Sequence, residues 1–216
     1  MNTNSQTEIK HLTVEELEDF LKTVYDAGNT RDFALFTTIY HWALRAAEAT
    51  DLRLDDLCLD SNQGHIRSKK GGIPATLTMI ATDGKPYMNQ LKALRRYVIE
   101  RRKPGQDFTE YVFASQKGGS LDPDSINRLF KKYIALTNER RALNGKPLIA
   151  KSVTHVHSLR HTRCTVAADA GEPLNYIRLV ARHRSIQTTL KYMHGSPLLA
   201  SKHWQSRVTD IHQQAV

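Results

Sequence analysis

The sequence has few of the features that define several common protein classes. Its 216 residues include only two cysteines, Cys58 and Cys164, and no CxxC pair, so a disulfide scaffold is excluded and a thiolate metal site is not expected. No apolar run approaches the roughly 20 residues that a membrane-spanning helix needs. The first ten residues contain no apolar segment of a secretory signal. We therefore expect a cytoplasmic protein with no membrane partner.

Linkers and repeats are also missing. There is no low-complexity segment, no repeat of 20–50 residues, and no stretch rich in Pro, Gly and Ser. Hydrophobic residues make up 40% of the chain, which is enough to form a core and too much for a disordered protein. A single domain over residues 1–216 is the simplest prediction.

Acidic residues are scarce in the larger part of the chain. Lys and Arg number 31 against 22 Asp and Glu, which gives a net charge of +9. Residues 1–64 carry −7 and residues 65–216 carry +16. A surplus of this size is typical of a protein that binds a polyphosphate such as nucleic acid. The alternative is a solvated basic surface with no partner.

Helical patterns dominate the chain. Thr13 with Glu16 forms a capping box that begins a helix through about Asp26. A second helical period begins near Arg31 and extends to Ala47. Further helices are predicted at about 84–102, 124–138, 157–170, 173–183, 185–193 and 198–211, with Gly171 ending one of them.

The stretch from Leu52 to about Met79 has a different pattern. It is short-period and interrupted by glycines, which predicts a small antiparallel sheet with a hairpin tip at residues 69–72. The predicted fold class is therefore α+β, a mainly helical single domain with one small antiparallel sheet.

Four local patterns could carry chemistry, and each has an ordinary structural explanation. Arg45 in the segment LRAAE either clamps a phosphate or caps a helix, and Lys69 at the hairpin tip could simply solvate a turn. His157 and Arg160 share a helix face, which suits a phosphate site or a polar surface. Tyr192, nine residues after His183, could be a packing residue.

Taken together and in this order, the four patterns resemble the catalytic domain of the tyrosine recombinases, the phage integrase family. The matching segments are LRAAE at 44–48, the hairpin lysine, HSLRHT at 157–162, and RHRSIQTTLKYMH at 182–194. The last two correspond to the family patterns HxLRHT and GHxSIxTTxxYxH. The resemblance spans about residues 10–195 and implies the tyrosine recombinase catalytic-domain fold.

The resemblance implies a role for each matching residue. Tyr192 would be the nucleophile, and Arg45 and Arg160 would hold the non-bridging oxygens of the scissile phosphate. His157 would be the general acid or base, and His183 would donate a hydrogen bond to the phosphate. The remaining implied roles belong to Lys69, which would protonate the leaving 5′ hydroxyl, and Glu48, which would support the arginines or the histidine site.

The match is imperfect at a few positions. The family usually has Leu-Gly before the third-motif histidine, and here Ala181 and Arg182 stand there, so we expect Arg182 to reach the DNA backbone. Lys70 is adjacent to Lys69 and could replace it, or contact DNA. Cys164 is expected in the core.

Length is the larger departure from the family. Most members carry a separate N-terminal DNA-clamping domain, and here the resemblance begins almost at residue 10, after a predicted N-terminal tail of residues 1–10. We expect no separate core-binding domain: either a naturally single-domain member, like the fimbrial-switch invertases, or a fragment. Residues 198–216 carry an apolar stripe that either contacts a neighbouring protomer or folds back on its own core.

The resemblance also implies an activity and partners. We expect a site-specific recombinase, encoded by the host or a mobile element, that acts on specific sites in double-stranded DNA in the nucleoid. It would form a homotetramer in the synaptic complex, with accessory DNA-bending proteins as further partners. No metal or other cofactor is expected, because two guanidiniums can neutralise a phosphate and no P-loop motif is present.

Two alternatives remain open at this point. The same residue set would suit a type IB topoisomerase-like enzyme that relaxes DNA, and the fold could also serve a catalytically silent DNA-binding regulator. A histidine-rich metalloprotein is a poor third alternative, because the ten histidines have no thiolate or carboxylate partners that complete a site.

Overall fold

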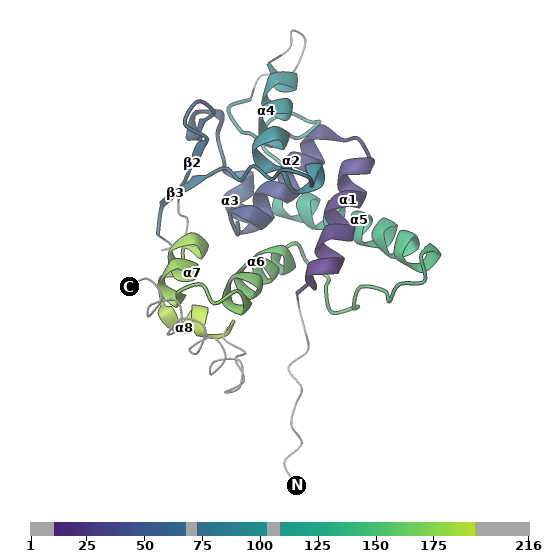
Figure 1. Ribbon diagram of the computed structural model, residues 1–216. Coiled ribbons are helices and arrows are strands. Elements are labelled where there is room, and N and C mark those ends of the chain that lie inside the picture. Colours follow the sequence, from purple (N-terminus) through teal and green to yellow (C-terminus); the bar gives the residue numbers. More distant parts are fainter. Residues whose placement is uncertain (1–10, 68–72, 103–108, 193–216) are drawn as a thin grey trace.

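The two N-terminal helices form the centre of the protein. The computed structural model, shown in Figure 1, describes residues 11–67, 73–102 and 109–192. Helix α1 spans Val14–Asp26, and helix α2 spans Thr30–His41. The predicted capping box of α1 is confirmed, since both of its reciprocal hydrogen bonds are present.

Helix α2 ends earlier than its hydrophobic period predicts. The prediction that it continues to Ala47 is wrong, because Ala43 adopts a left-handed conformation with φ of 47°. The N–H of Ala43 then donates to the carbonyl of Tyr40, and the N–H of Leu44 donates to the carbonyl of Ile39. These are the two hydrogen bonds that define a Schellman motif. A separate short helix, α3, follows at Ala46–Thr50.

The predicted small sheet is confirmed. A single 3₁₀ turn, η1 (Leu54–Asp56), leads into strand β1 (Leu57–Cys58), which pairs antiparallel with β2 (Gln63–Ile66). Strand β2 pairs antiparallel with β3 (Ala75–Thr78), so the order is β1-β2-β3. The predicted hairpin tip, with Lys69 and Lys70, lies outside the described residues.

Trp42 connects the end of α2 to this sheet. Its indole N–H donates to the carbonyl of Thr78 at 2.9 Å. Its ring lies so close to Gly64 that a Cβ at that glycine would be 2.2 Å from the ring. Glycine at position 64 therefore allows the sheet to contact the tryptophan, which fixes the turn that follows α2.

Two longer helices complete the main core. A 3₁₀ turn, η2 (Pro86–Met88), precedes α4 (Gln90–Arg101), and α5 spans Pro123–Leu143, five residues beyond its predicted end. The rings of Phe20 and Phe36 pack against Phe130, which brings α1, α2 and α5 into one hydrophobic core.

The last three helices lie together on the opposite side of the molecule from α4 (Figure 1). They are α6 (His157–Asp169), α7 (Leu174–Ala181) and α8 (Ile186–Leu190). Gly171, with φ of 78°, follows α6 as predicted. A small second cluster of buried residues forms here and includes Ala43 from the end of α2.

The architecture confirms the predicted α+β class. Its elements within the described ranges are mainly helical and include one three-stranded antiparallel sheet. None of the helices in those ranges is long and apolar enough to cross a membrane. The tail at residues 1–10 and the segment at 198–216 lie outside the described residues, so their predicted roles stay predictions.

Candidate active site

The ends of α2 and α7 meet at the first turns of α6. Both helices end on a non-glycine residue in the left-handed conformation, Ala43 after α2 with φ of 47° and Arg182 after α7 with φ of 56°. The N–H of His183 donates to the carbonyl of Arg178, as in a Schellman motif. Two sharp helix ends thus bring residues 43–48 and 181–183 together.

Arg160 joins these two helix ends. Its side chain is 1% exposed, and it donates to the carbonyl of Ala43 at 2.5 Å and to the carbonyl of Ala181. Carbonyls at helix C-termini lack partners within the helix and carry partial negative charge. A guanidinium between them therefore satisfies both ends and is itself fixed in place.

Arg182 is buried beside Arg160. Its guanidinium donates to the carbonyls of Trp42 (2.9 Å), Ala43 (3.0 Å) and Val180 (2.6 Å) and to the Glu48 carboxylate (2.7 Å). The side chain is 0% exposed. The expectation that Arg182 reaches the DNA backbone is therefore contradicted, because its charge is turned inward and already paired.

Glu48 is the carboxylate shared by this arginine cluster. One oxygen accepts from Arg182 and from the backbone N–H of Arg45 at 2.8 Å, and the other accepts from the Arg45 guanidinium at 2.7 Å. The Arg160 guanidinium lies 3.8 Å away. Burial by itself raises the pKa of Glu48, but the charge and hydrogen bond of Arg182 outweigh it and hold the pKa below its usual value.

Arg45 is the accessible member of the cluster. It lies immediately before α3 rather than within α2 as predicted, and its side chain is 38% exposed. Three guanidiniums and one carboxylate leave a surplus of positive charge, and Arg45 is the arginine through which it is presented to solvent. Such a surplus favours a bound anion.

A row of rings lies next to the arginines. His157 packs edge-on against His161, with their ring centroids 4.5 Å apart. The ring centroid of Tyr192 lies 5.4 Å from that of His161 and 6.0 Å from that of His183, on which Tyr192 stacks. The structure thus brings together Arg45, Glu48, His157, Arg160, His183 and Tyr192, as predicted. Lys69 and Lys70 lie outside the described residues.

The phenol of Tyr192 is held in the resting protein. The ring is buried, and its hydroxyl shares a hydrogen bond with the Cys164 thiol, which is itself buried as expected. His183 is 3% exposed, and its Nδ1 lies 3.0 Å from the Thr189 hydroxyl, which fixes the ring against the tyrosine. The phenol is therefore positioned by α6, α8 and the turn after α7.

The site shifts the pKa values of Tyr192, His183 and His157. Burial, with a contribution from Cys164, raises the pKa of Tyr192 to about 12, although Arg160 opposes the shift. Desolvation and the nearby arginines lower the pKa of His183 to about 3. Part of the His157 side chain is exposed, yet desolvation and its neighbours His161 and Arg160 lower its pKa to about 4. At neutral pH the phenol is therefore protonated and both imidazoles are neutral.

The sequence predicts no role for His161, and it does not predict that the side chain of Arg182 points inward. His161 connects His157 to Tyr192, and the signal for it was its position four residues after His157, on the same helix face. Nothing in the sequence shows where Arg182 points, because that depends on the left-handed turn at the end of α7.

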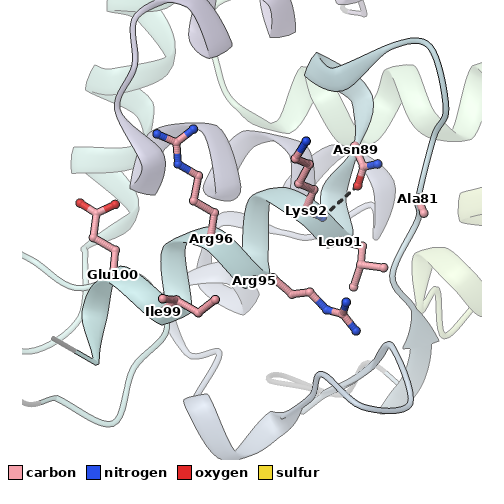
Figure 2. Close-up of a pocket in the computed structure, with 8 residues that line it drawn as sticks. All are labelled: Ala81, Asn89, Leu91, Lys92, Arg95, Arg96, Ile99 and Glu100. Atoms are coloured by element: carbon pink, nitrogen blue, oxygen red, sulfur yellow. Dashed lines mark hydrogen bonds between the residues drawn. The ribbon is translucent and has the colours of Figure 1, made fainter.

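A hollow in the surface lies away from this site. It measures about 620 Å³ and runs along α4, as Figure 2 shows, with Lys92, Arg95 and Arg96 among its lining residues. Arg95 is paired with the Leu59 carbonyl and the Asn62 side chain. None of the predicted site residues lines it, and in the part of the chain that the structure describes no group of three His, Cys, Asp or Glu residues could hold a metal ion.

The model of the phage integrase family matches residues 10–197, so the chain belongs to the phage integrase family, whose members include the tyrosine recombinases.

Individual relatives agree with this assignment. The chain is 29% identical over 195 residues to the TnP I resolvase of Bacillus thuringiensis, covering 90% of this chain and 59% of the relative. It is 27% identical over 191 residues to the tyrosine recombinase XerC of Syntrophus aciditrophicus, covering 84% and 55%. The chain thus spans a little over half the length of these curated relatives.

Solved structures share the fold. The XerA recombinase superposes with a TM-score of 0.71 at 22% identity, covering 91% of this chain and 65% of that one. The Tn1549 transposon integrase, in a complex with transposon right end DNA, gives a TM-score of 0.73 at 20% identity, covering 96% and 68%. These similarities support the catalytic-domain fold predicted from the sequence.

Proposed function

We propose that this chain is the catalytic region of a site-specific DNA recombinase that cleaves and rejoins strands through a 3′-phosphotyrosyl intermediate. One observation carries the proposal: the ring of Tyr192 lies between the imidazoles of His161 and His183, beside a buried arginine cluster with surplus positive charge. The names of the relatives, which include resolvases and integrases, support it.

The phenol would attack with the help of a base. A phenol with a pKa of about 12 is a poor nucleophile at neutral pH unless its proton is removed during the attack. A neutral imidazole can accept that proton, and His157 is connected to Tyr192 through His161. The phenol oxygen would form a bond to phosphorus as the bond from phosphorus to the 5′ oxygen breaks.

The arginines would stabilise the charge on the phosphate. Phosphoryl transfer is accelerated mainly by positioning and by neutralising the non-bridging oxygens. Arg45, which is partly exposed, and Arg160, which is fixed by two helix ends, would bind these oxygens, and His183 would add a hydrogen bond. No metal is needed for this step.

The leaving 5′ oxygen needs a proton. We assign its donation to Lys69, with Lys70 as the substitute. The phosphotyrosyl bond conserves the energy of the phosphodiester, so the reverse reaction with a second strand would rejoin the DNA without ATP. Strand exchange between two sites would take place in a homotetramer on double-stranded DNA in the nucleoid, with DNA-bending proteins as accessory factors.

Covalent capture on DNA tests the proposal. The purified protein is incubated with DNA from the flanks of its own gene, denatured with SDS and assayed for protein-linked DNA. We expect an adduct with the wild type and none with Tyr192→Phe, while both bind DNA equally. An adduct that persists in Tyr192→Phe would contradict the assignment of the nucleophile.

The same assay separates the alternatives. Relaxation of any supercoiled plasmid, without a preferred site, would favour the topoisomerase-like function. Binding without an adduct on any flanking DNA would favour a catalytically silent regulator.

A further inference from the structure

We infer that Arg182 is a positioning residue, which locks Glu48 and thereby holds the two phosphate-binding arginines in place for cleavage. This inference rests on the proposed function. It assigns Arg182 a task different from DNA contact and explains why an arginine occupies a position where the family usually has glycine.

The backbone conformation of Arg182 carries a local energetic cost. Arg182 has φ of 56°, a region that favours glycine and is unfavourable for residues with a Cβ. The side chain nevertheless lies fully buried and makes four hydrogen bonds. Its contacts therefore compensate for a conformation that glycine would adopt more easily.

Those contacts are aimed at the segment that carries Arg45. Arg182 donates to the carbonyls of Trp42 and Ala43, the last residues before the LRAAE segment. Arg160 donates to the same Ala43 carbonyl. One buried guanidinium therefore supports the turn that orients both phosphate-binding arginines.

Glu48 is the second group through which Arg182 affects the phosphate-binding arginines. Arg182 donates to one oxygen of Glu48 at 2.7 Å, whereas Arg160 lies 3.8 Å from the same oxygen. Arg182 is therefore the closer ion-pair partner of this oxygen. Without Arg182, the carboxylate would draw in Arg160 and compete with the phosphate for it. Arg182 thus leaves Arg160 available to the substrate.

The test compares the rate at which Arg182→Gly, Arg182→Lys and the wild type form the covalent adduct between Tyr192 and DNA. Glycine fits the left-handed backbone, so the first variant removes the side chain without adding strain. Lysine retains a charge but cannot make the four bonds. A matched control is Arg141→Gln, which removes another buried arginine, paired with Asp19 far from the site.

We expect both Arg182 variants to bind DNA as wild type does and to form the adduct about 10- to 100-fold more slowly, since small displacements of catalytic groups cost this much. Glu48→Gln combined with Arg182→Gly should be no slower than Arg182→Gly alone, because both changes remove the same ion pair between Arg182 and Glu48. Arg141→Gln should leave the adduct rate unchanged while lowering the melting temperature. An unchanged rate in Arg182→Gly, or additive losses in the double variant, would overturn the inference.

A second measurement does not depend on activity. Without Arg182 the buried Glu48 loses its strongest partner, so its charged form is no longer favoured in the fold. The difference in melting temperature between wild type and Arg182→Gly should therefore increase as the pH rises from 3.5 to 6, and a constant difference would overturn the lock. If wild type forms no adduct while this pH dependence is present, the proposed function fails and the lock stands.

Discussion

At the residue scale, burial and neighbouring charges hold His157 and Tyr192 in defined protonation states. The pKa of His157 is lowered to about 4 and that of Tyr192 is raised to about 12, so at neutral pH the phenol is protonated and the imidazole is neutral, as the proposed proton transfer requires. A bound phosphodiester adds negative charge, which favours the protonated imidazole and raises its pKa. Binding of DNA would thus strengthen the base at the moment it is needed.

His157→Gln should remove the acidic limb of the pH profile of adduct formation. In wild type the rate should rise with pH as the imidazole loses its proton and then level off, with a pKa above the value of about 4 of the free protein because the bound phosphodiester raises it. The variant should be slower by about 100-fold or more and insensitive to pH over the same range. Single-turnover rates between pH 4.5 and 8.5 measure this.

His155→Gln is the matched control, because this exposed histidine lies two residues before His157. It should retain the wild-type profile. A His157→Gln profile identical to that of wild type would show that another group is the base.

At the element scale, two helix ends position the residues of the candidate site. The left-handed residues Ala43 and Arg182 stop α2 and α7 at the same site, and Trp42 anchors the first of these ends on the sheet. The position of Arg45 therefore depends on the contact between Trp42 and Gly64, which come from different elements.

Gly64→Ala tests this dependence. An added methyl group would lie 2.2 Å from the Trp42 ring, so either the ring or strand β2 must move. We expect a loss of about 1–3 kcal/mol in the free energy of unfolding, measured with denaturant. Adding Trp42→Phe, which removes the part of the ring in the way, should make the double variant less unstable than the sum of the two single changes, and simple additivity would contradict the account.

The elements that could be predicted from sequence are those with local signals. The capping box at Thr13, the glycine after α6 and the spacing from His183 to Tyr192 each depend on neighbouring residues, and each led to a correct element or motif. The break after α2 was missed because alanine, and not glycine, occupies the left-handed position. The burial of Arg182 was missed because three of its four acceptors, Trp42, Ala43 and Glu48, lie 134 to 140 residues earlier in the sequence.

At the scale of the whole molecule, charge is unevenly distributed along the chain. Residues 1–64 carry a net charge of −7, and the remainder carries +16. Glu48, which belongs to the acidic part, is paired with arginines inside the buried cluster. Binding to a polyanion should therefore depend mainly on the larger, basic part of the chain.

Salt dependence measures this contribution. Each phosphate neutralised on duplex DNA contributes about −0.9 to the slope of log K against log salt concentration. We expect a slope of about −4 or steeper for wild type and the same slope for Tyr192→Phe, because a phenol is uncharged when DNA binds. A slope near zero, measured by fluorescence anisotropy between 50 and 300 mM salt, would contradict electrostatic binding.

Mass spectrometry of the covalent adduct tests the central claim most directly. After capture on DNA, the complex is digested with nuclease and trypsin, and the peptide that carries the remaining nucleotide is sequenced. The account predicts a nucleotide linked to the oxygen of Tyr192, in the peptide that follows Lys191. A nucleotide on another residue, such as the exposed Tyr176 of α7, would contradict it.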